Sequence, residues 1–190
     1  MRRRFIWGIM ALMAVGGMGM MSSCIGSGEN TPITMQGANI FPTLKGIDLH
    51  GKDRVVPRDL EGEWRLVTIA FEREQQKDVD TWIKALPEFE KVRSDLRYYE
   101  LPVIYEMTSA GRFWVNNGMR SGVTEDAARE RTITIYTDRE AFFAHMKMKQ
   151  DRISTLMLNP QGEIIWRHDG IADEIARTRL MKLLKELPHA

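Results

Sequence analysis

The sequence predicts an α/β fold, in which one mixed β-sheet carries helices on both faces. Three apolar runs have the length and composition of buried strands: Trp64–Phe71, Leu101–Met107 and Thr132–Thr137. The segments between them place apolar residues three and four positions apart, which is typical of amphipathic helices. Strands separated by helices favour parallel pairing, while a hairpin expected around Pro160 adds antiparallel strands at one side of the sheet.

Two short strands are expected at the start of the domain. Thr43–Leu49 and Asp53–Val56 flank His50-Gly51-Lys52, in which the glycine suits a hairpin turn. The turn Leu60–Glu63 then leads into Trp64–Phe71. The nearly continuous apolar character of that run predicts a central strand of the sheet.

A long helix is expected next, over Asp78–Tyr99. Its apolar residues recur on one helical face: Val79, Trp82, Ile83, Leu86, Phe89, Val92 and Leu96. Pro87 lies inside this stretch and is expected to kink or split the helix, because proline removes a backbone donor. The strand Leu101–Met107 follows, and the charged second half of Ser109–Arg131 is expected to be helical.

The last third of the chain repeats this alternation. Arg139–Lys149 has apolar residues at helical spacing. Ile153–Leu158 and Glu163–Arg167 flank the turn Asn159–Gly162 and predict the second hairpin. The chain closes with an amphipathic helix over Ile171–Leu187.

The first 23 residues have the pattern of an export signal. The positive stretch Arg2–Arg4 precedes the uncharged run Phe5–Met21. Ser22, Ser23 and Cys24 then resemble the lipobox of bacterial lipoproteins, whose cysteine thiol receives a diacylglyceryl group and becomes the new N-terminus. An uncleaved membrane anchor is the alternative. It would need about 20 apolar residues, and this run is shorter and interrupted by glycines.

Three parts of the chain follow from this pattern. Residues 1–23 form the lipoprotein signal, and residues 24–40, rich in small and polar residues, form a flexible tether. Residues 41–190 form one domain. The protein is therefore expected to be exported and lipid-anchored to a bacterial cell membrane through Cys24, with the choice between inner and outer membrane open.

The charge of the mature part argues against a nucleic-acid partner. Removing residues 1–23 leaves 24 Lys and Arg against 26 Asp and Glu, a formal charge of −2. The two signs are interspersed, so no basic stripe is present. Cys24 is the only cysteine, and if it is lipidated the folded domain contains no thiol.

Several short segments resemble thioredoxin-like redoxins. In the first half these are Phe41-Pro-Thr-Leu, Leu49-His-Gly-Lys, Leu60-Glu-Gly and Leu66-Val-Thr-Ile-Ala-Phe71. In the second half, Ser154–Gly170 is similar to the redoxin strand–turn–strand before the last helix. The resemblance covers about residues 41–187 and implies a thioredoxin-like fold with an N-terminal β-hairpin.

Phe71–Trp82 resembles the mitochondrial ATP-synthase assembly-factor family, which implies a thioredoxin-like domain without redox catalysis. Matching Pro87 to the helix proline of redoxins places Val79 and Trp82 at the two cysteine positions. Neither side chain can exchange a disulfide or reduce a peroxide. Ser154 and Thr155 lie where active redoxins have a cis-proline, so no catalytic residue is expected.

Other catalytic patterns are absent from the sequence. The four histidines are scattered without ligand spacing, so no metal site is expected. There is no Gly-x-Ser-x-Gly elbow and no phosphate-binding Gly-Lys-Ser/Thr loop. The sequence therefore indicates no enzyme activity and no cofactor.

A protein-binding surface remains as the candidate functional feature. The candidate partner-binding residues form two groups: Glu72, Arg73, Gln75 and Gln76 in a polar loop, and Phe113, Trp114 and Met119 in the segment before the charged helix. Aromatic and Met side chains are enriched in interfaces. The alternative for Phe113 and Trp114 is packing against the sheet, since large apolar residues are usually buried.

The leading interpretation is a redox-inactive, membrane-tethered protein that binds a protein partner of the cell envelope as an assembly or accessory factor. Two alternatives stay open. One is an oxidoreductase component whose thiols come from a partner, and the other is a lipoprotein that binds a small molecule in the former active-site cleft.

Overall fold

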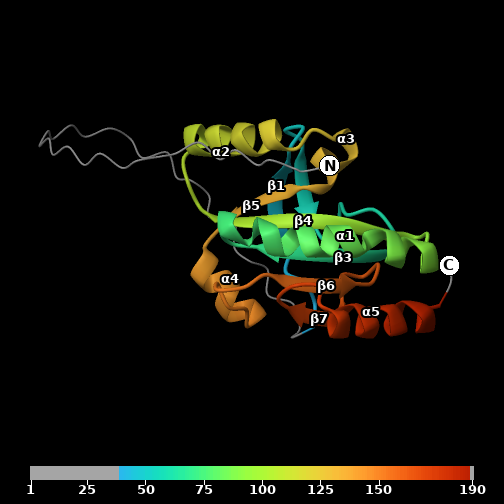
Figure 1. Cartoon of the computed structure of the whole chain (residues 1–190). Coiled ribbons are helices and arrows are strands. Elements are labelled where there is room, and N and C mark those ends of the chain that lie inside the picture. Colours follow the sequence, from blue (N-terminus) through green and yellow to red (C-terminus); the bar gives the residue numbers. More distant parts are fainter. Residues whose placement is uncertain (1–38, 189–190) are drawn as a thin grey trace, which may run out of the picture.

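The computed structural model describes residues 39–188 (Figure 1). One sheet contains seven strands in the order β2-β1-β5-β4-β3-β6-β7. Their bounds are β1 Leu44–Asp48, β2 Asp53–Val56, β3 Trp64–Ala70, β4 Leu96–Tyr105, β5 Ile133–Thr137, β6 Ser154–Leu158 and β7 Ile164–Asp169. The pairs β3–β4 and β4–β5 are parallel and the other four are antiparallel, so the sheet is mixed as predicted.

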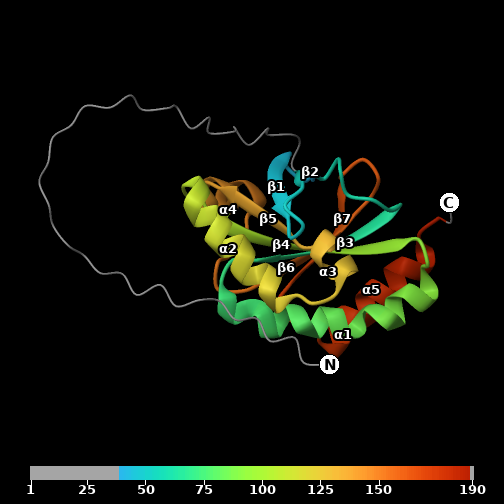
Figure 2. The ribbon, with the colours of Figure 1, turned by 90° about the horizontal axis from the view of Figure 1, so that it is seen from above.

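Helices cover both faces of this sheet. Their bounds are η1 Arg73–Gln75, α1 Gln76–Val92, α2 Ser109–Gly122, α3 Asp126–Arg131, α4 Arg139–Met146 and α5 Glu174–Glu186. On one face, α1 and α5 lie side by side (Figure 2) and pack on alternate strand residues such as Leu66 and Met157. On the opposite face, α4 packs on Val67 and Leu156, the neighbours of those residues along each strand.

A smaller cluster lies toward the N-terminal hairpin. There Met119 of α2, Val123 and Ala128 of α3 pack with Leu49. The helices α2 and α3 therefore cover the side of the sheet that contains β1 and β5, next to α1 (Figure 2).

One boundary of the sequence prediction is wrong. The helix expected over Asp78–Tyr99 ends at Val92, and Leu96 begins β4. Arg93 adopts an extended backbone conformation, and β4 then pairs in register with β3 from Trp64↔Leu96 to Ala70↔Pro102. Leu96 is buried on the face of the sheet that α1 covers. An apolar residue at this position therefore fits both the helical repeat of α1 and the two-residue repeat of a strand.

Pro87 lies within α1, and the helix runs through it as one element rather than being split. The mixed segment after β4 forms two helices, and only the second is the charged one that the sequence predicts.

The folded part begins before Phe41. The carbonyl oxygen of Asn39 accepts a hydrogen bond from Ile164 N at 2.7 Å, and Ile40 forms a β-bridge with Glu163. The export signal, Cys24 and the rest of the expected tether lie outside the described residues. Within residues 39–188, no helix has the length and apolarity needed to cross a bilayer.

Candidate functional site

The candidate site is the junction between β3 and α1, here defined as Phe71–Gln76. It follows the carboxyl end of a central strand that is parallel to β4 and leads into a helix N-terminus. In open α/β sheets, ligands bind outside the carboxyl ends of the strands. The fold therefore places this segment where chemistry or binding is expected.

Gln75 fixes the backbone of the junction. Its side chain is buried, and its Oε1 accepts hydrogen bonds from Phe71 N at 2.7 Å and Glu72 N at 3.2 Å. Its Nε2 donates to the carbonyl oxygen of Gln150 at 2.7 Å. Because both amide ends are used, Gln75 connects the junction to the segment before β6.

Glu72 continues this connection at the surface. Its Oε1 accepts from Arg139 Nη2 at 2.8 Å and from Gln150 Nε2 at 2.7 Å. Partial burial alone would raise the pKa of Glu72, but the two hydrogen bonds and the charge of Arg139 outweigh it and hold that pKa below its ordinary value. The carboxylate is therefore ionised at neutral pH.

Arg139 is the buried cation of the network. It begins α4 and is 4% exposed. Its guanidinium carbon lies 4.3 Å from the ring centroid of Tyr105, 5.5 Å from that of Phe143 and 5.9 Å from that of Phe71. An arginine stacked on aromatic rings and paired with a carboxylate is held in one geometry. Four elements, β3, β4, α4 and the segment before β6, therefore meet at the junction.

The sequence analysis missed Arg139 and Gln150. A signal for Arg139 was present, because it occupies the first turn of a predicted helix, where the macrodipole disfavours a cation. Such a residue needs a compensating carboxylate, which Glu72 supplies. Nothing in the sequence marks Gln150, which lies 78 residues from Glu72.

The positions matched to the redoxin cysteines lie beyond the junction. Val79 and Trp82 are inside α1 and buried at 2% and 0% exposure. Trp82 Nε1 donates to the carbonyl oxygen of Gly170 at 3.0 Å, and its ring lies 5.9 Å from Trp166. Both residues belong to the core under α1.

Ser154 and Thr155 are the first residues of β6, and both are fully buried. Ser154 Oγ donates to Asp169 Oδ1 at 2.8 Å, and Thr155 Oγ1 lies 3.2 Å from Thr68 Oγ1 across the strand pair. Both hydroxyls are used within the sheet.

Two of the candidate partner-binding residues are not on the surface. Met119 is 1% exposed in the cluster under α2, and Gln75 is 6% exposed. Only their residue types suggest them as partner-binding residues, and both are used within the fold: Met119 packs with Val123, and both amide ends of Gln75 are hydrogen-bonded. Arg73 is exposed, Glu72 is nearly half exposed, and Gln76 is partly exposed.

Phe113 and Trp114, in contrast, lie on the surface. They are 62% and 72% exposed, and their rings lie edge to face with centroids 6.4 Å apart. The alternative that they pack against the sheet is therefore wrong. Such exposure suits contact with a protein partner or with another apolar surface.

The described part of the chain has cavities at both ends of the parallel strands. A small one of about 40 Å³ lies between α1 and α2 and is lined by junction residues together with Ile104 and Met119. A larger one of about 280 Å³ lies at the opposite end of the parallel strands, beside Arg54, Tyr99 and Arg131.

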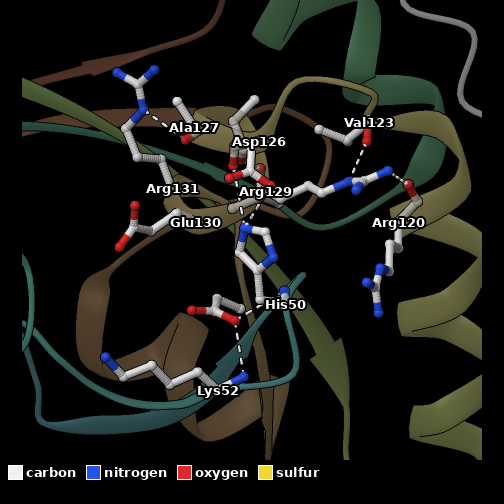
Figure 3. A network of polar contacts seen from close by, with 12 residues as sticks. His50, Lys52, Arg120, Val123, Asp126, Ala127, Arg129, Glu130 and Arg131 are labelled. Atoms are coloured by element: carbon white, nitrogen blue, oxygen red, sulfur yellow. Dashed lines mark hydrogen bonds and ion pairs between the residues drawn. The ribbon is translucent and has the colours of Figure 1, made fainter.

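A polar network next to the larger cavity connects the N-terminal hairpin to α3 (Figure 3). His50 Nε2 lies 3.5 Å from Asp126 Oδ1, and Arg54 pairs with Asp48 and Glu130. Arg129 Nε donates to the carbonyl oxygen of Val123 at 2.7 Å (Figure 3). These contacts hold the hairpin in place.

In residues 39–188 no group of three or more His, Cys, Asp and Glu side chains could hold a metal ion. The junction itself presents an ionised carboxylate, a buried guanidinium and two amides. These groups can donate or accept hydrogen bonds and form ion pairs, and none of them is a thiol.

The structure has a thioredoxin-like fold. It is similar to the thioredoxin domain of a thiol-disulfide oxidoreductase from Bacteroides vulgatus, with a TM-score of 0.52 at 15% identity over 80% of this chain and 99% of that one. It is also similar to copper-bound ScoI of Arabidopsis thaliana, with a TM-score of 0.53 at 12% identity over 76% and 98%. No protein-family model and no curated protein matches the sequence. The similarity thus establishes the fold.

Proposed function

We propose that this chain is a membrane-anchored, redox-inactive lipoprotein that binds a protein partner and serves it as an assembly or accessory factor. The observation that carries the proposal is the closed network at the junction. A thioredoxin-like oxidoreductase needs a reactive thiolate near the start of this helix. Here Gln75 bonds to the backbone of Phe71 and Gln150, and Glu72 pairs with Arg139 instead. Residues 39–188 contain no cysteine.

The exposed side of the same junction supports partner binding. Arg73 and Glu74 are exposed, and Glu72 is 45% exposed in its ion pair. The buried contacts of Gln75 and Arg139 hold this loop in a single conformation. A preorganised loop loses little conformational entropy on binding, which favours recognition of a protein surface.

The N-terminal sequence supports the membrane anchor. Cys24 follows a basic and then apolar segment, and 14 residues separate it from Asn39. Two or three acyl chains contribute about 0.8 kcal/mol per buried methylene, which is enough for stable anchoring. The partner is therefore a protein exposed at the surface of the same membrane.

The size of the cavities disfavours a small-molecule-binding role for the former active-site cleft. The cavity beside the junction has about 40 Å³, whereas pockets for small molecules have about 300–1,000 Å³. The larger cavity lies at the other end of the sheet and belongs to a different surface.

Site-specific photo-cross-linking in cells tests the partner. A photoreactive residue at Arg73 is expected to give a discrete protein adduct from the membrane fraction. The same residue at Lys182, which is 78% exposed on α5, is the matched control and is expected to give none. Equal adduct patterns at the two positions would contradict the proposal that the exposed side of the junction binds the partner.

An insulin-reduction assay tests the redox part. The full chain carrying Cys24→Ser is expected to show no turnover above the uncatalysed rate. Turnover in that variant would contradict a redox-inactive domain. Turnover that appears only after the cross-linked protein is added would favour the alternative in which a partner supplies the thiols.

A further inference from the structure

The outward surface of α2 combines apolar and cationic groups. Its exposed residues recur three and four positions apart and form one face, here called the outer face of α2: Ala110, Phe113, Trp114, Asn117, Arg120 and Ser121. The opposite face buries Met119 against Val123 and Leu49. The outer face is thus a stable feature of the fold, because the other side of the helix is part of a packed cluster.

The charge of α2 differs from that of the chain as a whole. The helix contains Arg112 and Arg120 and no acidic residue, whereas the complete sequence is nearly neutral. Arg112 is paired with Glu106 and lies over the ring of Tyr136. Arg120 is exposed at the outer face. Trp is enriched at membrane–water interfaces, and helices that lie there combine such aromatic residues with Lys or Arg.

We propose that the outer face of α2 docks on the anionic headgroups of the bilayer that holds the chain, with Phe113 and Trp114 inserted at the interface and Arg120 beside them. This inference rests on the membrane anchor of the proposed function. Charge complementarity favours an anionic lipid surface over a protein, because the outer face offers one cation and no carboxylate for reciprocal pairing.

The length of the chain before Asn39 makes the contact feasible. Fourteen residues span at most about 50 Å when extended, and a domain of this size has a radius of gyration of about 15 Å. The tether enters at β7, where Ile164 N donates to Asn39 O. It is thus long enough for the domain to turn α2 toward the bilayer.

Tethering also lowers the affinity that the outer face needs. A short flexible linker gives an effective concentration of about 1 mM. A surface with a dissociation constant in that range is therefore occupied about half of the time. The strength of the contact scales with the apolar area of Phe113 and Trp114 and with the attraction of Arg120 to anionic lipid, and a tethered protein needs only a weak contact of this kind.

Hydroxyl-radical footprinting of the full lipidated chain tests the contact. The chain is reconstituted in protein-free vesicles of phosphatidylethanolamine and phosphatidylglycerol, and oxidation is measured residue by residue. Phe113 and Trp114 are expected to be oxidised at least about twofold more slowly than in detergent micelles. Ile171 and Ile175, which are 46% and 62% exposed, are the internal control and are expected to change little.

A charge reversal tests the role of the cation. Arg120→Glu is expected to weaken the surface contact on the order of tenfold, and so to restore oxidation of Trp114. Arg179→Glu, an exposed charge on α5, is the matched control and is expected to leave the protection unchanged.

Three outcomes would overturn the proposal. If the chain floats with the vesicles and the two aromatic residues are not protected, the outer face of α2 does not dock, while the anchor stands. If the chain does not float, the anchor itself fails and this inference fails with it. If protection appears in native membranes and is missing in protein-free vesicles, the outer face binds a protein instead.

Discussion

The junction and the outer face of α2 are neighbours, yet they differ in the side chains that they expose. At the junction, Glu72 pairs with Arg139 Nη2 and both amide ends of Gln75 are hydrogen-bonded, while Arg139 Nε is buried without a hydrogen-bond partner. On α2, Phe113 and Trp114 are exposed, and their rings lie edge to face with each other. The junction thus exposes polar side chains such as Arg73 and Glu74 above a hydrogen-bonded interior, whereas α2 exposes an aromatic pair.

The largest expected effect comes from two tryptophans on different helices. Trp82→Ala removes a fully buried indole and its hydrogen bond to Gly170, so it is expected to lower the free energy of unfolding by about 3–5 kcal/mol. Trp114→Ala, at 72% exposure, is expected to change it by no more than about 0.5 kcal/mol. Urea denaturation of both variants provides the comparison.

A large loss of stability in Trp114→Ala would mean that the outer face of α2 is part of the packed structure. The docking surface would then have no exposed aromatic residue. A small loss in Trp82→Ala would return that position to the candidate functional residues.

These two tryptophans also show what could be predicted from the sequence. Apolar runs and helical periodicity predict the α/β fold. Burial of one face makes apolar residues recur every second position in a strand and every third or fourth position in a helix. Periodicity also placed Trp82 on the buried face of its helix. It could not place Phe113 and Trp114, since adjacent residues on a helix point in different directions and only the packing partners decide which side is covered.

The sequence predicts one part of the candidate site, its loop, and not the residues that contact the loop. The resemblance to redoxins predicts the loop containing Glu72, because polar residues stand there in place of the reactive loop. Its partners Arg139 and Gln150 come from segments 67 and 78 residues away, and the sequence contains no local signal for such contacts. The Leu96 boundary failed because Leu96 fits a helix face and a strand face equally well.

The second prediction concerns the closure of the junction. Arg139→Ala is expected to destabilise the domain by about 2–3 kcal/mol, because it removes a buried side chain packed on three rings and leaves Glu72 without its cation. Arg139→Lys is expected to recover only a minor part, since an ammonium lacks the planar stacking surface. Thermal and urea unfolding measure both.

An exposed arginine in the same molecule is the control for that experiment. Arg58→Ala removes a surface pair with Asp59 and is expected to have little effect. If Arg139→Ala were as mild as Arg58→Ala, the junction would be an open, adaptable loop, and its contrast with the outer face of α2 would disappear.

The smallest expected effect is a pH dependence at Glu72. The pKa of this carboxyl is lower in the folded state than its ordinary value near 4.5, because the hydrogen bonds and charge outweigh the desolvation. The folded state therefore binds fewer protons than the unfolded state in this range. The resulting stability is fully present above the unfolded pKa and is lost as the pH falls through the folded pKa.

Glu72→Gln removes this contribution, so the gap in stability between the wild-type protein and the variant is expected to be largest at neutral pH and to shrink below about pH 4. Urea midpoints measured from pH 7 to pH 3 follow the gap. Glu74→Gln changes an exposed carboxylate of the same turn and is the matched control. If the stability gap between the wild-type protein and Glu74→Gln shrinks by the same amount, the effect comes from net charge. A gap that shrinks only for Glu72→Gln would mean that the ion pair with Arg139 holds the junction in its folded geometry in solution, so that its exposed polar side is preformed.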